Sequence, residues 1–89
     1  MKVFLHRIAE KYLNRLNPAD RNRFNAAFTA LEKEPPEGDI TLYQGNPGVL
    51  RLKVGNYRAL FKFVEDSIFV THIEPRGQAY TKKTQNKRG

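Results

Sequence analysis

The first third of the chain carries a strand-like and then a helix-like pattern of apolar residues. Residues 2–5, KVFL, form a short apolar run that is long enough for one strand. From Ile8 onward, apolar residues recur at helical spacing with polar residues between them, which predicts a first helix. Asn17 can cap a second helix, and Pro18 suits its first position because a missing N–H costs nothing there. The prolines of residues 34–38, EPPEG, end that second helix.

The remainder of the chain predicts a sheet. Four runs of apolar or alternating residues are separated by turn signals: residues 40–43, 49–54, 57–64 and 67–73. Gly55 and Asn56 both take a positive φ readily, so they suit a two-residue hairpin turn between the second and third runs. The expected fold is therefore α+β, with an N-terminal strand and a helical hairpin packed on one apolar face of an antiparallel sheet.

Length and composition limit the chain to one small domain. The chain has 89 residues, of which 39% are hydrophobic, enough to form a modest core. We expect this domain to span residues 1–81, and residues 82–89, which are polar and charged, to form a flexible basic tail. The absence of cysteine and of any long apolar run favours a cytoplasmic protein without disulfides, and we expect no metal, no cofactor and no membrane partner.

The charge of the chain is positive and unevenly distributed. The net charge is +7, and residues 72–89 carry five bases against one acid. A basic excess of this kind favours polyanionic partners, although it also fits an ordinary soluble surface or an acidic protein partner. Four bases alternate with apolar residues in the predicted strands and so point to the face that the helices leave open: Arg51, Lys53, Arg58 and Lys62.

Bases that crowd on neighbouring strands repel one another, at a cost of some tenths of a kcal/mol per pair. The four acids of residues 35–71 are expected in loops, where they would not offset this repulsion. Such a cost favours a functional explanation, and a bound phosphate is the simplest one. The competing interpretation is that these bases simply face solvent on an ordinary strand surface and bind nothing.

Two stretches of the chain resemble a known family. The run LRLKVGNYRALF has alternating bases, a turn and then Tyr-Arg, and IEPRGQAY follows the last predicted strand with an arginine and a tyrosine. Together with the preceding helical hairpin, they resemble the RelE/ParE superfamily of bacterial and archaeal toxins. The resemblance implies the toxin of a type II toxin–antitoxin system. It further implies a metal-independent endoribonuclease that cleaves mRNA in the ribosomal A site, next to ribosomal RNA, and is inhibited by a cognate acidic antitoxin.

In the reaction that this resemblance implies, the 2′-hydroxyl of the RNA attacks the adjacent phosphate. The residues that match the catalytic positions of the family are Lys53, Arg58, Arg76 and Tyr80, and those expected to bind RNA are Arg51, Lys62, Lys82 and Lys83. The two arginines suit the phosphate, because a guanidinium can hold two of its oxygens at once. Lys53 could be a base if neighbouring cations lower its pKa, and Tyr80 could stack on a nucleobase or transfer a proton.

Some positions depart from the family pattern, and the resemblance therefore does not assign the residue that acts as general base. Glu74 and Pro75 precede Arg76 where the family often has a further base, and Arg51 stands where a lysine is common. A lone histidine in a strand is usually structural, so His72 carries no assigned role.

Two other functions compete with RNA cleavage. A ParE-like toxin would inhibit DNA gyrase by binding it, and members of that branch lack the cluster of catalytic bases. A plain RNA-binding module would carry aromatic residues among the bases of the open face. Most aromatic residues of this chain are instead expected on covered faces or helices, which disfavours the module.

Overall fold

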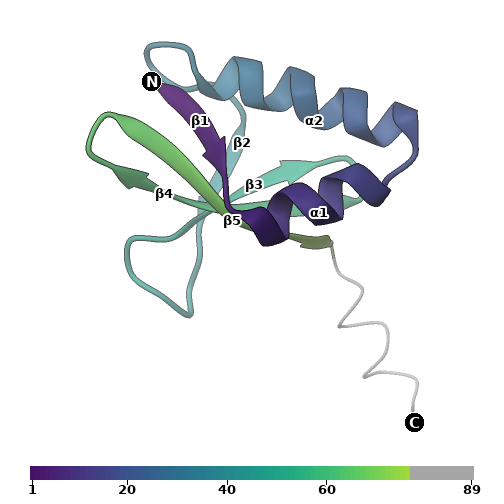
Figure 1. Ribbon diagram of the computed structural model, residues 1–89. Helices are drawn as coiled ribbons and strands as arrows, with labels where there is room; N and C mark the ends of the chain where they lie inside the picture. The colour runs from purple at the N-terminus through teal and green to yellow at the C-terminus, as the bar shows by residue number, and fades with distance from the viewer. Residues whose placement is uncertain (77–89) are drawn as a thin grey trace, which may run out of the picture.

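The structure is a computed structural model that describes residues 1–76 of the chain. Five strands and two helices follow one another along these residues (Figure 1). Their bounds are β1 Lys2–Leu5, α1 Arg7–Arg15, α2 Pro18–Leu31, β2 Asp39–Leu42, β3 Leu50–Val54, β4 Tyr57–Val64 and β5 Ser67–Pro75. The order of elements is the predicted one. No helix within these residues has the length and apolar character that crossing a membrane requires.

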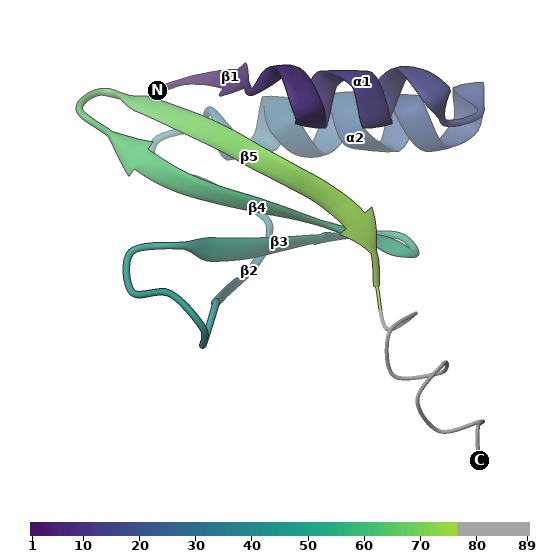
Figure 2. The same ribbon diagram turned by 60° about the horizontal axis from the view of Figure 1, so that its bottom comes forward.

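The five strands form one sheet in the order β1-β5-β4-β3-β2. Strands β2 to β5 make the predicted antiparallel meander, whereas β1 lies parallel to β5, so the sheet is mixed. Both helices lie over one face of the sheet, and the other face, which we call the open face, is left uncovered by them (Figure 2). The predicted α+β layer is thus confirmed. Apolar alternation does not encode strand direction, which is why the parallel pairing was not foreseen.

Local hydrogen bonds begin both helices where the sequence indicates. The His6 imidazole Nδ1 accepts from the Ile8 backbone N at 3.0 Å, which makes this histidine the N-cap of α1. The Asn17 side chain accepts from the Asp20 backbone N at 2.8 Å at the start of α2. One detail of the predicted apolar stripe is wrong, because Ile8 is 56% exposed and its neighbour Ala9 is buried instead.

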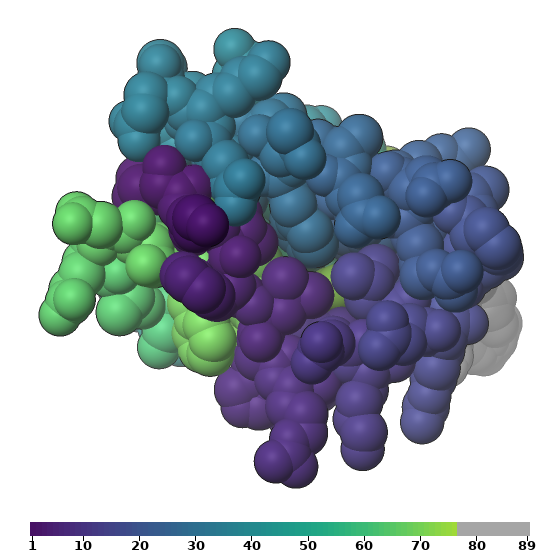
Figure 3. All heavy atoms as spheres, turned by 45° about the horizontal axis from the view of Figure 1, so that its top comes forward, coloured from purple at the N-terminus to yellow at the C-terminus, as the bar shows by residue number. Residues whose placement is uncertain are grey.

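The core lies between the helices and the covered face of the sheet. Its largest fully buried side chains are Phe24, Phe61, Leu31, Leu52, Ile68 and Val70. Phe63 lies two residues after Phe61 on the same side of β4 and pairs with the buried Ile68, yet it is 46% exposed. The tip of the β4–β5 hairpin projects beyond the helices (Figure 3), so no helix covers the end of β4. Burying large apolar side chains contributes about 1.5–3 kcal/mol each, which makes this face the main source of stability.

Strand β5 is longer than predicted and continues to Pro75 instead of ending at residue 73. It contains a register shift opposite Leu60 and Phe61, where Thr71 is the additional residue and its hydroxyl donates to the Leu60 carbonyl at 3.3 Å. Proline is tolerated at the end of β5 because β1 pairs only as far as Val70, which leaves that edge of the strand without a neighbour.

Candidate functional site

Four charged residues lie side by side in one row across the open face. Asp39 of β2 pairs with Lys53 of β3, Lys53 pairs with Arg58 of β4, and Arg58 pairs with Glu74 of β5. Neighbouring strands are about 4.8 Å apart, so the two cations in the middle are close neighbours. The row, which we call the charged row, therefore places two adjacent bases between two acids.

Each base of the charged row contacts the acid beside it. The Lys53 Nζ lies 3.8 Å from an oxygen of Asp39, and the Arg58 Nε donates to Glu74 Oε2 at 2.5 Å. The Arg58 side chain is only 19% exposed, while that of Glu74 is 36% exposed. The prediction that the nearby acids lie in loops is wrong for Asp39, which begins β2. These two carboxylates offset the repulsion between Lys53 and Arg58.

Arg76 is held against the turn that joins β3 to β4. Its backbone N donates to the Asn56 carbonyl at 2.8 Å, and its guanidinium Nη1 donates to the Gly55 carbonyl at 3.4 Å. Asn56 lies two residues before Arg58 in the chain, so Arg58 and Arg76 occupy the same end of the sheet. Gly55 has a φ of +58°, a conformation that glycine adopts without strain.

Arg23 of α2 brings a third arginine to this end of the sheet. A Cβ atom at Gly55 would lie 3.8 Å from the Arg23 Nη1, so the Gly55 turn lies close to both Arg23 and Arg76. Arg23 also forms an ion pair with Asp20 at 3.0 Å. The sequence analysis missed this residue because it lies in a helix, more than fifty positions before Arg76.

The remaining predicted bases of the open face lie outside the charged row. Arg51 is in the next row, where its Nε donates to the Thr41 hydroxyl at 3.3 Å, and it lines a hollow of about 830 Å³ beside the loop of residues 43–49. Lys62 lies four residues beyond Arg58, about 13 Å along the strand. His72 is exposed on the open face in the row of Arg51, and its Nδ1 lies 3.2 Å from the Thr71 hydroxyl.

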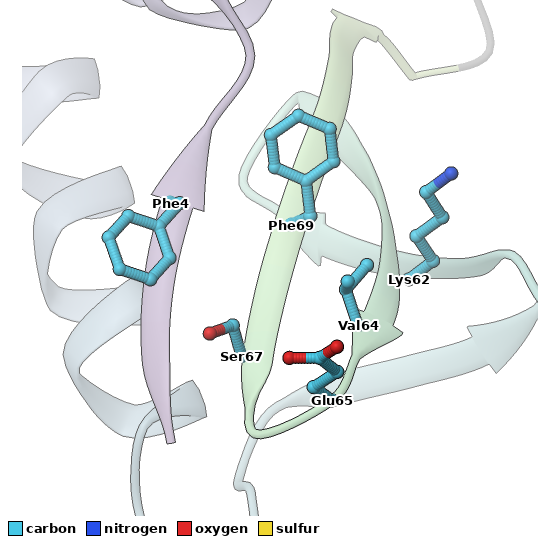
Figure 4. A pocket seen from close by; sticks show the side chains of 6 residues that line it. All are labelled: Phe4, Lys62, Val64, Glu65, Ser67 and Phe69. Carbon is cyan, nitrogen blue, oxygen red and sulfur yellow. The ribbon is translucent and has the colours of Figure 1, made fainter.

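A groove of about 520 Å³ lies on the open face near the tip of the β4–β5 hairpin. Figure 4 shows the rings of Phe4 and Phe69 on neighbouring strands, and Lys62, Val64 and Glu65 from the end of β4 and the turn after it also line the groove. Phe4 is 52% exposed. These two residues are exceptions to the expectation that most aromatic residues lie on covered faces or helices. The parallel pairing of β1 with β5 puts Phe4 directly opposite Phe69.

Comparison with known families identifies the chain. The family model of the ParE toxin of type II toxin–antitoxin systems matches residues 3–80. The chain belongs to this toxin family. The resemblance to the RelE/ParE superfamily is confirmed, and no curated protein sequence matches the toxin.

Solved structures of RelE toxins share the fold of this toxin. RelE in the RelE–RelB complex of Pyrococcus horikoshii is 27% identical, with a TM-score of 0.71 and coverage of 86% of this chain and 96% of that one. RelE in the RelB–RelE complex of Methanococcus jannaschii is 20% identical, with a TM-score of 0.70 and coverage of 88% and 95%. The isolated E. coli RelE toxin is 16% identical, with a TM-score of 0.70 and coverage of 97% of both chains.

Three of the predicted site residues lie beyond the part of the toxin that the structure describes. Tyr80, Lys82 and Lys83 lie outside the described residues. Within residues 1–76, no three side chains of His, Asp or Glu come together as the ligands of a metal ion would.

Two tyrosines lie on the helix side of the same end of the sheet. The ring of Tyr57 packs against Tyr12 with 6.2 Å between centroids and against Phe24 with 5.9 Å. Burial, the negative charge of Asp20 and a hydrogen bond to its carboxylate raise the pKa of Tyr57. Burial raises the pKa of Tyr12, and so do the negative charge that Tyr57 carries once it is ionised and the negative charge of Glu74. Both phenols are therefore neutral at neutral pH, and neither is a candidate general base.

The raised pKa of Tyr57 predicts a loss of stability at high pH. A phenol whose pKa is higher in the folded state stabilises the fold below its unfolded pKa of about 10, and this contribution is lost as the pH rises through the folded pKa. We expect the free energy of unfolding to fall above about pH 10, and Tyr57→Phe to reduce that fall. Urea unfolding at several alkaline pH values measures both. An unchanged slope in the variant would contradict the raised pKa.

Proposed function

We propose that the toxin is a ribosome-dependent endoribonuclease of the RelE type, which cleaves mRNA in the A site and so inhibits translation. The observation that carries the proposal is the position of Lys53 and Arg58 side by side on the open face, with Arg76 at the same end of the sheet. Three cations from different parts of the chain give a site that suits a phosphodiester. The RelE fold of the structural relatives also supports this function.

The reaction proposed is attack of a ribose 2′-hydroxyl on the adjacent phosphorus. It gives a 2′,3′-cyclic phosphate and a 5′-hydroxyl, and its transition state carries extra negative charge on the phosphoryl oxygens. In this proposal Arg58 and Arg76 hold those oxygens, because guanidinium groups bind them through paired hydrogen bonds. Lys53 adds positive charge beside Arg58, while Arg51 and Lys62 bind more distant parts of the RNA. Tyr80, Lys82 and Lys83 enter the proposal through the family resemblance alone.

A cognate antitoxin is the second proposed partner. The RelE chains of P. horikoshii and M. jannaschii were each solved in complex with RelB. We propose that the antitoxin of this toxin is acidic, as the net charge of +7 favours. The groove around Phe4 and Phe69 suits an amphipathic segment of that antitoxin, with apolar side chains in the groove and an acidic one near Lys62.

Substitution of Arg58 or Arg76 tests the nuclease. We expect Arg76→Ala and Arg58→Ala each to lower mRNA cleavage in cells by roughly a hundred- to a thousand-fold, because each removes charge from the transition state. The measurement is growth after induction, together with mapping of mRNA 5′ ends. Lys11→Ala is the matched control, since Lys11 is exposed on α1, away from the open face, and it should leave cleavage unchanged.

Inhibition of gyrase is the alternative outcome of this experiment. If the unmodified toxin arrests growth without cutting mRNA, and blocks supercoiling by purified gyrase, the ParE-like function is correct and the nuclease proposal is wrong. Full cleavage by the Arg76→Ala variant would instead show that Arg76 is not part of the site, and the nuclease proposal would stand.

A substitution in the groove tests the antitoxin surface. We expect Phe4→Ser to weaken antitoxin binding at least tenfold, because apolar anchors at an interface contribute about 1–2 kcal/mol or more. Titration calorimetry with the purified antitoxin measures the affinity. Ile8→Ser is the control, since Ile8 is similarly exposed but does not line the groove. Equal affinities for the two variants would show that the antitoxin binds elsewhere.

A further inference from the structure

Glu74 is one of the two acids that flank the bases of the charged row. It lies opposite Arg58 on the open face and accepts a hydrogen bond from the Arg58 Nε at 2.5 Å. A carboxylate at this position repels an RNA phosphate and competes with it for Arg58. An ion pair that remains partly exposed contributes little to stability, so stability alone is a weak reason for this acid.

The proposed reaction requires a group that accepts the proton of the 2′-hydroxyl. Lys53 is poorly placed for this task, because its ammonium Nζ already contacts the Asp39 carboxylate at 3.8 Å, and an ammonium has no lone pair to accept a proton. Tyr57 and Tyr12 are excluded by their raised pKa. A carboxylate is ionised at neutral pH and can accept a proton directly.

We infer that Glu74 is the general base of the toxin. This inference rests on the proposed nuclease function and names the residue that the family resemblance leaves open. In the reaction, Glu74 Oε2 takes the proton of the 2′-hydroxyl while the 2′-oxygen forms a bond to phosphorus. The bond between phosphorus and the 5′-oxygen then breaks, and the 5′-oxygen takes a proton from water. Protons and electron pairs balance without an oxidant, a reductant or a metal.

The contact between Glu74 and Arg58 suits this role in two ways. A phosphate bound by the Arg58 guanidinium brings its own ribose close to the carboxylate that the same guanidinium holds. When Glu74 takes the proton, it loses its negative charge, and its attraction for Arg58 weakens. The positive charge of Arg58 is then available to the phosphoryl oxygens at the moment when their negative charge increases.

Among residues 1–76, the charged groups near Glu74 come from three elements and from the residue after β5. Arg58 of β4 lies opposite, Lys53 of β3 lies one strand further, and Arg76 follows two residues later in the chain. Tyr12 of α1 lies near enough for the charge of Glu74 to raise its pKa. The described neighbours of Glu74 are therefore mostly cationic.

Single-turnover cleavage of mRNA on purified ribosomes tests the inference, with ribosome binding measured in parallel. We expect Glu74→Gln to cleave about 10²–10⁴-fold more slowly than the unmodified toxin, because general base catalysis contributes a factor of this size. Binding should be unchanged or tighter, since a negative charge has been removed. Glu74→Asp should cleave at an intermediate rate, because its carboxylate is retained but lies further from Arg58.

Glu37→Gln is the matched control and should cleave at the full rate. Glu37 is also held in an ion pair, with Lys33 at 3.3 Å, but it lies in the segment before β2. Cleavage by Glu74→Gln at the full rate or faster would overturn the inference, and so would a parallel loss of binding and cleavage in both Glu74 variants. If the unmodified toxin cuts no mRNA, the proposed function itself fails.

Discussion

Burial of one face of the sheet against the two helices is the constraint on which the rest of the structure depends. Leu52, Ala59 and Ile73 pair with one another across three strands and are buried beneath the helices. Side chains alternate along a strand, so a shift by one residue would expose this set and bury the charged row. The energy of the core therefore fixes not only the fold but also the position of Lys53, Arg58 and Glu74 on the open face.

The charged row places two bases next to each other and offsets their repulsion with two acids. Lys53 and Arg58 repel each other, and Asp39 and Glu74 at the ends of the row reduce that cost. Both pairs are partly exposed, so exchange of a carboxylate for a phosphate, as proposed above, has only a small energetic cost. The proposed function makes use of this exchange, and the proposed role of Glu74 gives one of the two carboxylates a chemical task.

Much of the fold and part of the candidate site could be predicted from the sequence. The alternation of Arg51, Lys53 and Arg58 with apolar residues was sufficient to assign them to the face opposite the helices, and the Gly55-Asn56 turn followed from backbone preference. The contacts of Asp39 and Glu74 could not be predicted, because they depend on where β2 begins and β5 ends. Strand ends are set by cross-strand pairing, which a local pattern does not contain.

Contacts between elements that are distant in the chain also could not be predicted from the sequence. Arg23 reaches the Gly55 turn only because α2 crosses the sheet, and Phe4 meets Phe69 only because β1 pairs in parallel with β5. Both contacts depend on the tertiary arrangement of the elements and not on the local propensity of the residues. Ile8 and Phe63 fit their apolar patterns but lie where no neighbouring element covers them.

Membership of the ParE toxin family and a RelE fold do not by themselves decide between a nuclease and an inhibitor that only binds, because one fold can carry several functions. The groups that face the substrate decide it. The most direct measurement is the chemistry of mRNA ends after the purified toxin acts on ribosomes programmed with a defined message. Cuts at the A-site codon that leave a 2′,3′-cyclic phosphate and a 5′-hydroxyl are the predicted result. Intact message on ribosomes saturated with active toxin would contradict it.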